Sequence, residues 1–290
     1  MNIKNNWVIT LACILLLLTA NVSSASSFTL PHTHVIPIKD TQQDRQYELY
    51  IKLPEGYDKH KDTAYPVIYY TDAQWHMELL SGATAFLMEN AILVGISWQI
   101  NTKGALKDKE ASASRGRDFS IRASSDPKVQ AKHQRGQANN HLAFIRNDII
   151  QYIENQYNAD PNNRTYFGFS FGGLFGSYIL MAKPDTFKNY ILGSPSLWRD
   201  IPHLLELGTQ HKQLNANVFI SYGALEDKLG IHVNEFVELL HKRHDKSLKL
   251  KKLSLSPQAI AIPFLCSACA VLAGYQHSSA ANKVSNLRFG

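Results

Sequence analysis

Cysteine is scarce in this chain of 290 residues, which contains only three. Cys13 lies in an apolar N-terminal segment, and Cys266 and Cys269 lie near the C-terminus. The two cysteines near the C-terminus cannot by themselves build the disulfide framework on which many small exported domains depend. Their Cys-x-x-Cys spacing has no second pair to complete a zinc site and no βαβ context for redox chemistry. We therefore expect stability to come from a large hydrophobic core.

Long basic runs are also lacking. The chain has 30 Lys and Arg residues against 24 Asp and Glu residues, which gives a formal net charge of +6. This mild excess forms no array suited to nucleic acid, so we expect no nucleic-acid partner. The sequence gives no indication of the oligomeric state.

The N-terminal apolar run is too short for a comfortable membrane span. It covers residues 8–20, follows Lys4 and precedes small residues that end at Ala25. A membrane helix needs about 20 apolar residues, whereas this arrangement is typical of a secretory signal peptide. We expect cleavage after Ala25 and export to the periplasm or the medium, without a stable membrane span in the mature chain. An uncleaved anchor is the alternative.

Segments with strand and helix patterns alternate along residues 26–290. Continuous apolar runs at 65–70 and 91–98 are typical of strands buried on both faces. Such alternation predicts a single α/β domain, a mainly parallel sheet with helices on both faces. Further strands are predicted at 45–53, just before Gly168, and at 190–192, 217–222 and 248–255, and helices at 140–157, after Ser170 and at 231–241.

Residues 104–137 are polar and show no clear period. We interpret them as a long excursion over the surface near the site, because long loops in compact domains are usually functional or mobile. Residues 103–135 contain nine Lys or Arg residues against four acidic ones. A basic rim would favour anionic substrates, although a solvated charged loop is equally consistent with the pattern.

A Gly-x-Ser-x-Gly pattern, formed by Gly168, Ser170 and Gly172, stands between a strand-like run and a helix-like segment. In this context it is typical of the turn that exposes a nucleophilic serine. The strained turn requires small neighbours two residues away. The helix start can stabilise an oxyanion through its free N–H groups, and we expect Phe171 to supply one. A glycine-rich turn that only packs a helix on the sheet is the alternative.

Candidate partners of Ser170 follow later strands in the order acid, then histidine, which is the order of the α/β-hydrolase triad. A serine hydroxyl needs a base that titrates near pH 7, and a carboxylate can orient that imidazole. His277 follows the last predicted strand in a glycine-bearing loop, and we predict it as the base. Glu226 and Asp227 follow strand 217–222; position favours Glu226 as the acid, and either could be a solvated carboxylate.

The second oxyanion donor should come from the loop after strand 65–70, where Ala73 and Gln74 are the candidates. Aromatic side chains near the predicted site could line a substrate pocket or pack in the core. These aromatic residues are Trp75, Phe169, Phe171 and Trp198.

Several segments, spread in order over nearly the whole mature chain, resemble the esterase D-like family of α/β-hydrolases. They are YPVIYYTDAQWH, RGRDF, YFGFSFGGLFGSYIL, GSPSLW, SYGALED and GYQHSSA with NLRF. Members of this family include siderophore esterases such as enterobactin hydrolases. The resemblance implies an α/β-hydrolase fold and hydrolysis of a small-molecule carboxylic ester without a metal or organic cofactor. It also implies Ser170 as nucleophile, His277 as base and Glu226 as acid.

One departure from the family pattern is an apolar segment at about 257–273, before His277. The family passes from the last strand to the histidine in a few residues, so this segment looks like an insertion of about fifteen residues. If it displaces His277, the chain would be inactive. Three hypotheses follow: an exported serine esterase that acts through an acyl-enzyme, with siderophore esters as candidate substrates; an acyltransferase on the same fold; and a non-catalytic binding protein.

Overall fold

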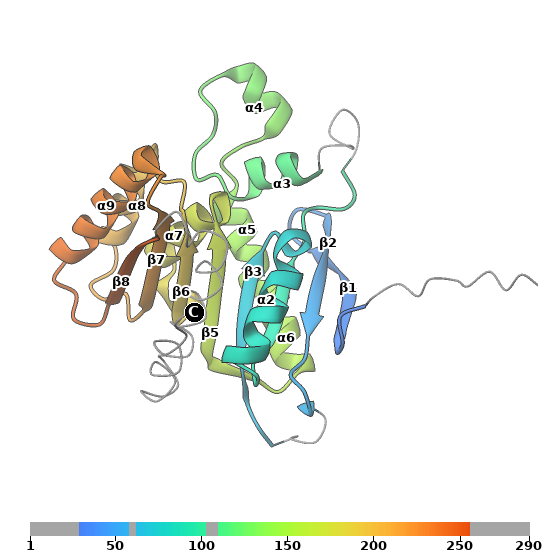
Figure 1. The fold of residues 1–290 in the computed structure, drawn as a ribbon. Coiled ribbons are helices and arrows are strands. Elements are labelled where there is room, and N and C mark those ends of the chain that lie inside the picture. Colours follow the sequence, from blue (N-terminus) through green and yellow to red (C-terminus); the bar gives the residue numbers. More distant parts are fainter. Residues whose placement is uncertain (1–28, 58–61, 103–109, 256–290) are drawn as a thin grey trace, which may run out of the picture. The chain divides into compact units, whose positions relative to one another are not determined.

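A sheet of eight strands runs through the described residues, in the order β1-β2-β4-β3-β5-β6-β7-β8 (Figure 1). β1 pairs with β2, and β2 with β4, in antiparallel fashion, whereas all other neighbours are parallel. The strands are β1 (Thr33–Asp40), β2 (Arg45–Lys52), β3 (Tyr65–Thr71), β4 (Ile92–Ile96), β5 (Ala159–Phe169), β6 (Asn189–Gly193), β7 (Asn217–Gly223) and β8 (Lys249–Leu255). The predicted mainly parallel α/β architecture is therefore confirmed.

The structure is a computed structural model that describes residues 29–57, 62–102 and 110–255. The chain divides into residues 1–30 and residues 31–290, and every described helix and strand belongs to the second unit. The predicted signal peptide, the apolar segment at 257–273 and His277 lie outside the described residues. No described helix is both long enough and apolar enough to cross a membrane.

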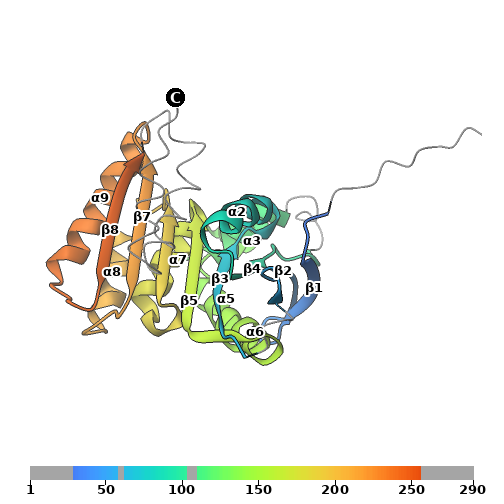
Figure 2. The same cartoon turned by 60° about the horizontal axis from the view of Figure 1, so that its bottom comes forward.

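Helices cover both faces of the sheet (Figures 1 and 2). α2 packs on one face against β2, β3 and β4, while α7 packs against β5, β6 and α8 on the other. The helical elements are α2 (Ala73–Leu87), α3 (Glu110–Asp118), α4 (Pro127–His133), α5 (Ala138–Phe144), the π-helical turn η3 (Ile145–Ile149), α6 (Ile150–Gln156), α7 (Phe171–Ala182), the 3-10 turn η4 (Pro184–Thr186), α8 (Ile201–Thr209) and α9 (Asp227–Lys242).

The core lies where these layers meet the central strands. Every residue of β3, β4 and β6 is buried, as expected for strands covered on both faces. β2 instead alternates between buried and half-buried residues, because its pleat exposes one side. Since burial of apolar surface contributes roughly 25 cal/mol per Å², these central strands are the main source of the stability that the few cysteines cannot supply.

The surface excursion is more ordered than its sequence predicts. It contains the helices α3 and α4, and the last residue of α3, Asp118, is buried. The Asp118 carboxylate accepts hydrogen bonds from Tyr47 Oη at 2.9 Å, Ser114 Oγ at 2.9 Å and Arg117 Nε at 2.7 Å. A buried charge persists when it is paired and hydrogen-bonded in this way. The network therefore ties the excursion to β2 of the sheet.

Candidate active site

Ser170 stands between β5 and α7 with φ 55° and ψ −110°. A non-glycine residue with positive φ is strained, and such residues cluster at functional sites. Neighbouring backbone holds the strained turn: Ser170 N–H donates to Gly193 O at 2.8 Å, and Ser196 N–H donates to Ser170 O at 3.1 Å. The predicted strand–turn–helix geometry is present, with a serine at its apex.

The glycines of the pattern are required by close packing around this turn. A Cβ on Gly168 would collide with the carbonyl group of Gly172, and a Cβ on Gly172 would lie 2.6 Å from Thr71 Oγ1. Tyr166 Oη also donates to Gly172 O at 2.8 Å and lies 3.3 Å from Thr71 Oγ1. Residues of β3 and β5 therefore pack closely against the turn, which leaves no room for a side chain at Gly168 or Gly172.

The Ser170 side chain is half-buried, and its Oγ lies 3.3 Å from Ser196 Oγ. Ser196 itself is buried and follows β6 in the GSPSLW segment. Its N–H group and its hydroxyl both contact Ser170, so this loop fixes the nucleophile candidate from two sides. Ser196 was not among the predicted site residues, although its position three residues beyond a parallel strand is a signal for the site edge.

The residues predicted as oxyanion donors lie at the starts of two helices. Phe171 is the first residue of α7, and Ala73 and Gln74 are the first two residues of α2. The first N–H groups of a helix have no intrahelical acceptor, so they remain available to a ligand. The loop before α2 lies against the turn, since Thr71 and Asp72 would be the neighbours of a Cβ on Gly172. Both helix starts therefore approach the Ser170 turn.

Asp72 is a fully buried residue that the sequence analysis did not assign to the site. It precedes α2 with φ 59° and ψ 48°, and its Oδ1 accepts from Trp98 Nε1 at 2.7 Å and Arg115 Nε at 2.8 Å. The Arg115 guanidinium lies 4.9 Å from the centre of the Trp75 ring. Asp72 thus joins the loop before α2 to the excursion. Trp98 and Arg115 are far from Asp72 in sequence, so the sequence does not reveal these contacts. Only the position of Asp72 directly after β3 could have indicated that it belongs to the site.

The structure separates the two candidate acids. Glu226 Oε2 accepts from Ser194 Oγ at 2.6 Å and from Gly223 N–H at 2.7 Å, so its carboxylate has a fixed position beside the loop after β6. Asp227 is exposed and begins α9. Of the two, Glu226 is the one held at the carboxyl edge of the sheet. The predicted base, His277, lies outside the described residues.

His76 is a second histidine near the turn, and it is buried. Its Nδ1 lies 3.1 Å from Thr71 O, which can only accept, so the Nδ1–H tautomer donates there. Burial lowers the pKa of His76, which keeps the ring neutral at physiological pH. Its ring also packs edge-on against Phe167. These contacts give His76 a structural role under the loop before α2.

A pocket of about 520 Å³ opens beside the turn. Phe171, Ser196 and Trp198 line it, together with three arginines, Arg122, Arg135 and Arg199.

Two of these arginines come from the excursion, as the predicted basic rim requires, and all three are exposed. Arg122 also donates to Asp200 Oδ1 at 2.8 Å and to the Arg199 carbonyl, which ties the excursion to the loop after β6.

The aromatic residues predicted for the pocket divide into two groups. Phe171 and Trp198 line the pocket, and Trp198 is 48% exposed. Trp75 is 55% exposed but packs edge-on against Trp98, with ring centres 4.8 Å apart, and does not line the pocket. Phe169 ends β5 and is half-buried, and it is not among the lining residues either. Within the described residues, no cluster of His, Cys, Asp and Glu side chains could hold a metal ion.

Comparisons with known proteins agree with this geometry. The model of the family described as "Putative esterase" matches residues 41–253, which is more than half of the chain. Ferri-bacillibactin esterase BesA of Bacillus subtilis (strain 168) is 28% identical over 247 residues, which cover 77% of this chain and 81% of BesA. The siderophore triacetylfusarinine C esterase of Aspergillus fumigatus is 28% identical over 129 residues, 44% of this chain and 39% of that enzyme.

Solved structures show the same fold. The BES protein from Bacillus cereus superposes with a TM-score of 0.70 at 24% identity, over 85% of this chain and 96% of that chain. The siderophore hydrolase EstB from Aspergillus nidulans superposes with a TM-score of 0.71 at 17% identity, over 87% of this chain and 97% of that chain. The chain therefore belongs to the esterase family and is a carboxylic ester hydrolase with the α/β-hydrolase fold.

Proposed function

We propose that this chain is an exported serine esterase that hydrolyses ester bonds of siderophores. The main support for the proposal is the strained turn at Ser170, which lies beside a pocket lined by Arg122, Arg135 and Arg199. Three guanidinium groups against the single carboxylate of Asp200, which pairs with Arg122, leave an excess of positive charge. Such an excess favours a substrate with negative charge, such as a ferric catecholate ester. The names of BesA and of the triacetylfusarinine C esterase give independent support, since both describe siderophore esters as substrates.

The proposed reaction has two halves. Ser170 Oγ attacks the ester carbonyl while His277 takes the serine proton, and the bond to the alcohol breaks as His277 returns that proton to it. Water then attacks the acyl-enzyme, with His277 again as base, and releases the acid and free Ser170. Glu226 holds the imidazole in the required tautomer. N–H groups of Phe171 and of Ala73 or Gln74 stabilise the negative oxygen in both steps.

Substrate cleavage is the direct test of this proposal. The purified protein should release the hydrolysed products of a ferric catecholate triester, as measured by liquid chromatography and mass spectrometry. Ser170→Ala should abolish this release. Arg122→Gln and Arg199→Gln should raise KM for the ferric ester about tenfold, while KM for the uncharged ester p-nitrophenyl acetate stays unchanged. Equal effects on both esters would contradict a role of these arginines in recognising anionic substrates.

The two alternatives predict different outcomes in related experiments. An acyltransferase would convert the acyl-enzyme to a new ester when an acceptor alcohol is added, whereas the esterase gives only hydrolysis products. A non-catalytic binding protein would leave Ser170 unlabelled by a fluorophosphonate, because labelling requires an activated serine. Rapid labelling of Ser170 that is lost in Ser170→Ala would therefore reject the binding protein.

Export forms a separate part of the proposal and rests on residues 1–25. Expression with this segment should deliver the protein outside the cytoplasm, with a mature N-terminus at Ser26, which N-terminal sequencing would detect. Retention of residues 1–25 in membrane-bound material would instead identify an anchor.

A further inference from the structure

Asp72 occupies the N-cap position of α2, but its side chain does not cap the helix. An aspartate at this position ordinarily accepts a hydrogen bond from the N–H group of the second or third helical residue, here Gln74 or Trp75. The Trp75 N–H group donates instead to the Asp72 carbonyl oxygen at 2.9 Å, and no described residue accepts from the N–H groups of Ala73 and Gln74. These two predicted oxyanion donors are therefore available because the Asp72 carboxylate lies elsewhere.

Two residues from other segments hold the Asp72 carboxylate in place. Its Oδ1 accepts from Trp98 Nε1, just beyond β4, at 2.7 Å and from Arg115 Nε, on α3 of the excursion, at 2.8 Å. Its Oδ2 is buried and has no hydrogen-bond partner among the described residues. Because Trp98 is a neutral donor, it is Arg115 that balances the buried charge. The position of the carboxylate therefore depends on Arg115.

Arg115 is itself fixed by aromatic rings. The Cζ atom of its guanidinium lies 4.9 Å from the ring centre of Trp75 and 5.9 Å from that of Phe119, and the side chain is 19% exposed. Cations are attracted to aromatic faces at such distances. The Trp75 ring also packs edge-on against Trp98, the second donor to Asp72. Arg115 thus carries the excursion to the start of α2 in a set orientation.

The backbone of Asp72 is held in a conformation that it would otherwise leave. Its φ of 59° and ψ of 48° are left-handed, which is unfavourable for a residue other than glycine. Residues that cap a helix with their side chain are instead extended. Loss of the bond to Arg115 would let Asp72 relax to an extended conformation and accept from the Gln74 N–H group. Relief of strain and capping therefore favour the same rearrangement.

We propose that Arg115 is a positioning residue for ester hydrolysis. Together with Trp98 it keeps the Asp72 carboxylate away from the Gln74 N–H group, which stays available to the negative oxygen of the transition state. Without Arg115, Asp72 caps α2 and places its own negative charge where that oxygen forms. This inference rests on the proposed serine esterase mechanism. It gives the excursion a role in assembling the oxyanion site, in addition to lining the substrate pocket.

Steady-state kinetics with the uncharged ester p-nitrophenyl acetate tests this proposal. Arg115→Gln should lower kcat about 10²-fold, as loss of one oxyanion donor does. KM should change less than about twofold, because the donor acts mainly on the transition state. Asp72→Gly, added to Arg115→Gln, should restore kcat to within about fivefold of the wild type, since glycine has no carboxylate and adopts the left-handed conformation without strain.

This rescue separates positioning from a merely structural role. If Arg115 only stabilised the fold, the second substitution would add its own loss to the first. Trp98→Phe decides if Arg115→Gln does not fold, because it removes the other donor to Asp72 and keeps an aromatic ring. It should lower kcat about tenfold, with the same rescue by Asp72→Gly. Absence of rescue in both pairs of variants would overturn the proposal.

Amide exchange at Gln74, followed by NMR, reports the cap independently of activity. The Gln74 N–H group should exchange about tenfold more slowly in Arg115→Gln than in the wild type, and fast again when Asp72→Gly is added. Unchanged exchange in Arg115→Gln, or slower exchange without loss of kcat, would overturn the proposal. If the wild type cleaves no ester, the proposed function fails, and exchange still decides whether Arg115 holds Asp72 off the helix start.

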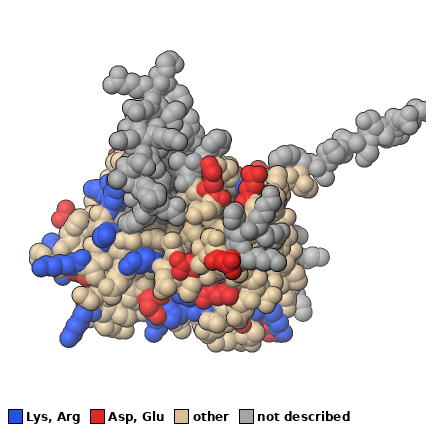
Figure 3. All heavy atoms as spheres, turned by 90° about the horizontal axis from the view of Figure 1, so that it is seen from below, with Lys and Arg blue, Asp and Glu red and all other residues tan. Residues whose placement is uncertain are grey.

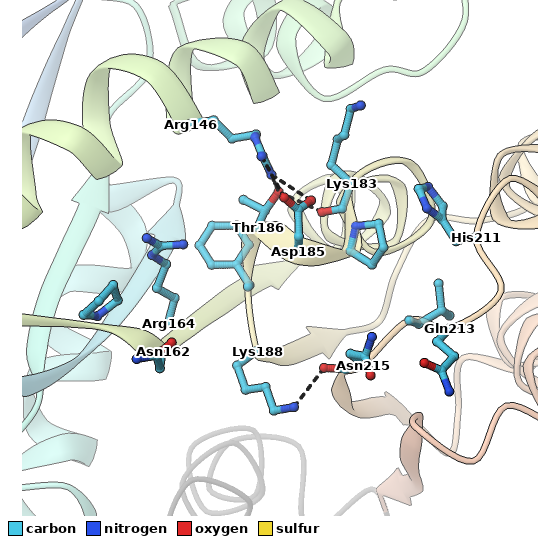
Figure 4. Close-up of a pocket in the computed structure, with 14 residues that line it drawn as sticks. Arg146, Asn162, Arg164, Lys183, Asp185, Thr186, Lys188, His211, Gln213 and Asn215 are labelled. Atoms are coloured by element: carbon cyan, nitrogen blue, oxygen red, sulfur yellow. Dashed lines mark hydrogen bonds and ion pairs between the residues drawn. The ribbon is translucent and has the colours of Figure 1, made fainter.

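The control substitution lies at the opposite edge of the sheet from Ser170, near the start of β5. Seen from below, opposite α4, the molecule carries Lys and Arg among Asp and Glu, so loss of one positive charge leaves this side mixed in sign (Figure 3). Arg164 is one of the side chains at this edge (Figure 4). Its Nε contacts Glu154 Oε1 at 2.6 Å, and both side chains are 20% exposed, close to the 19% of Arg115.

Arg164→Gln therefore breaks a comparable pair without touching Asp72. Its kcat should stay within about twofold of the wild type, as expected for a substitution far from the reacting atoms. An equal fall of kcat in Arg164→Gln and Arg115→Gln would show that general loss of stability lowers the activity, and would overturn the proposal.

Discussion

The two edges of the parallel sheet differ in where the backbone is strained. At the carboxyl edge, β3, β5 and β6 are each followed directly by a non-glycine residue with positive φ: Asp72 at 59°, Ser170 at 55° and Ser194 at 39°. No described residue directly before these three strands has a positive φ. Each such residue costs on the order of 1–3 kcal/mol unless its surroundings hold it. Asn215, two residues before β7, also has a positive φ, of 48°, so what distinguishes the carboxyl edge is that its strained residues directly follow the strands of the proposed site.

The opposite edge differs in the ion pairs that hold its arginines. Its arginines are held by ion pairs, Arg146 with Asp185 and Arg164 with Glu154, on relaxed backbone. Strain fixes a nucleophile within a fraction of an ångström, which bond-making requires, whereas ion pairs near the surface can exchange one anion for another. Substitutions at each edge can test this difference.

Substitution of the nucleophile candidate should have the largest effect. Ser170→Ala should lower kcat for p-nitrophenyl acetate by at least about 10⁴-fold, because the serine and its base act as one unit. The melting temperature should stay near the wild-type value or rise, since the alanine removes no core contact. Ser254→Ala, in exposed β8, is the control that should retain full activity. Residual activity above a few per cent in Ser170→Ala would show that another group attacks the ester.

Substitution of Glu226, the carboxylate at the same edge, should have the next largest effect on kcat. Glu226→Gln keeps the shape of the side chain and can still accept from Ser194 and Gly223, but it loses the negative charge that stabilises an imidazolium. We expect kcat to fall by about 10²-fold or more, whereas Asp227→Asn should change it less than about twofold. Steady-state kinetics of both variants gives the ratio. The opposite order would assign the acid to Asp227.

A methyl group in the turn should have an intermediate effect. Gly172→Ala places a Cβ 2.6 Å from Thr71 Oγ1, so either β3 or the turn must move. We expect kcat to fall about 10²-fold, since misplacement by about 1 Å has such costs, and the free energy of unfolding to fall by about 1–3 kcal/mol.

Gly82→Ala in α2 is the matched control for this substitution. No atom lies within 4 Å of the added Cβ, so alanine should stabilise the helix by up to about 1 kcal/mol. Urea unfolding and esterase kinetics measure both variants. Full activity in Gly172→Ala would mean that the turn tolerates relaxation and that strain is not needed there.

Sequence patterns predicted the central strands because burial on both faces leaves continuous apolar runs, as at 65–70 for β3. They also located the turn at Ser170, because close packing around the turn requires glycine at positions 168 and 172. β1 was missed because three of its eight residues are exposed and only its pairing with β2 defines it. α2 was missed because its first residues have no side-chain cap.

The contacts of Asp72 and Ser196 could not be predicted for a different reason. Asp72 meets Trp98 and Arg115, and Ser196 meets Ser170, only after the strands between them are paired. The spacing of residues within a short segment of the chain does not indicate such long-range contacts. The π-turn at η3 is similar, because the helical period of residues 140–157 predicts one continuous helix and gives no sign of the extra residue that aims Arg146.

The smallest effect is expected for the ion pair between Arg146 and Asp185, at the edge where the parallel strands begin. The hydrogen bond from Arg146 lowers the pKa of Asp185, so the folded protein favours the charged carboxylate. A lowered pKa stabilises the fold at pH values above the unfolded pKa of about 3.9, and this contribution is lost as the pH falls through the lower folded value. Because the Asp185 side chain is 68% exposed, solvent screens the pair, and Asp185→Asn should cost less than about 1 kcal/mol.

Urea unfolding at pH 7 and at pH 2.5 measures this difference between the wild type and Asp185→Asn. The two proteins should differ slightly at pH 7, and the difference should shrink at pH 2.5, while kcat for p-nitrophenyl acetate stays the same in both. A kcat that falls with this substitution would couple the two edges through α7, which joins the Ser170 turn to the segment that carries Asp185. Unchanged kcat, together with a small loss of stability confined to higher pH, would show that the edge with Asp185 can be altered without disturbing the edge with Ser170.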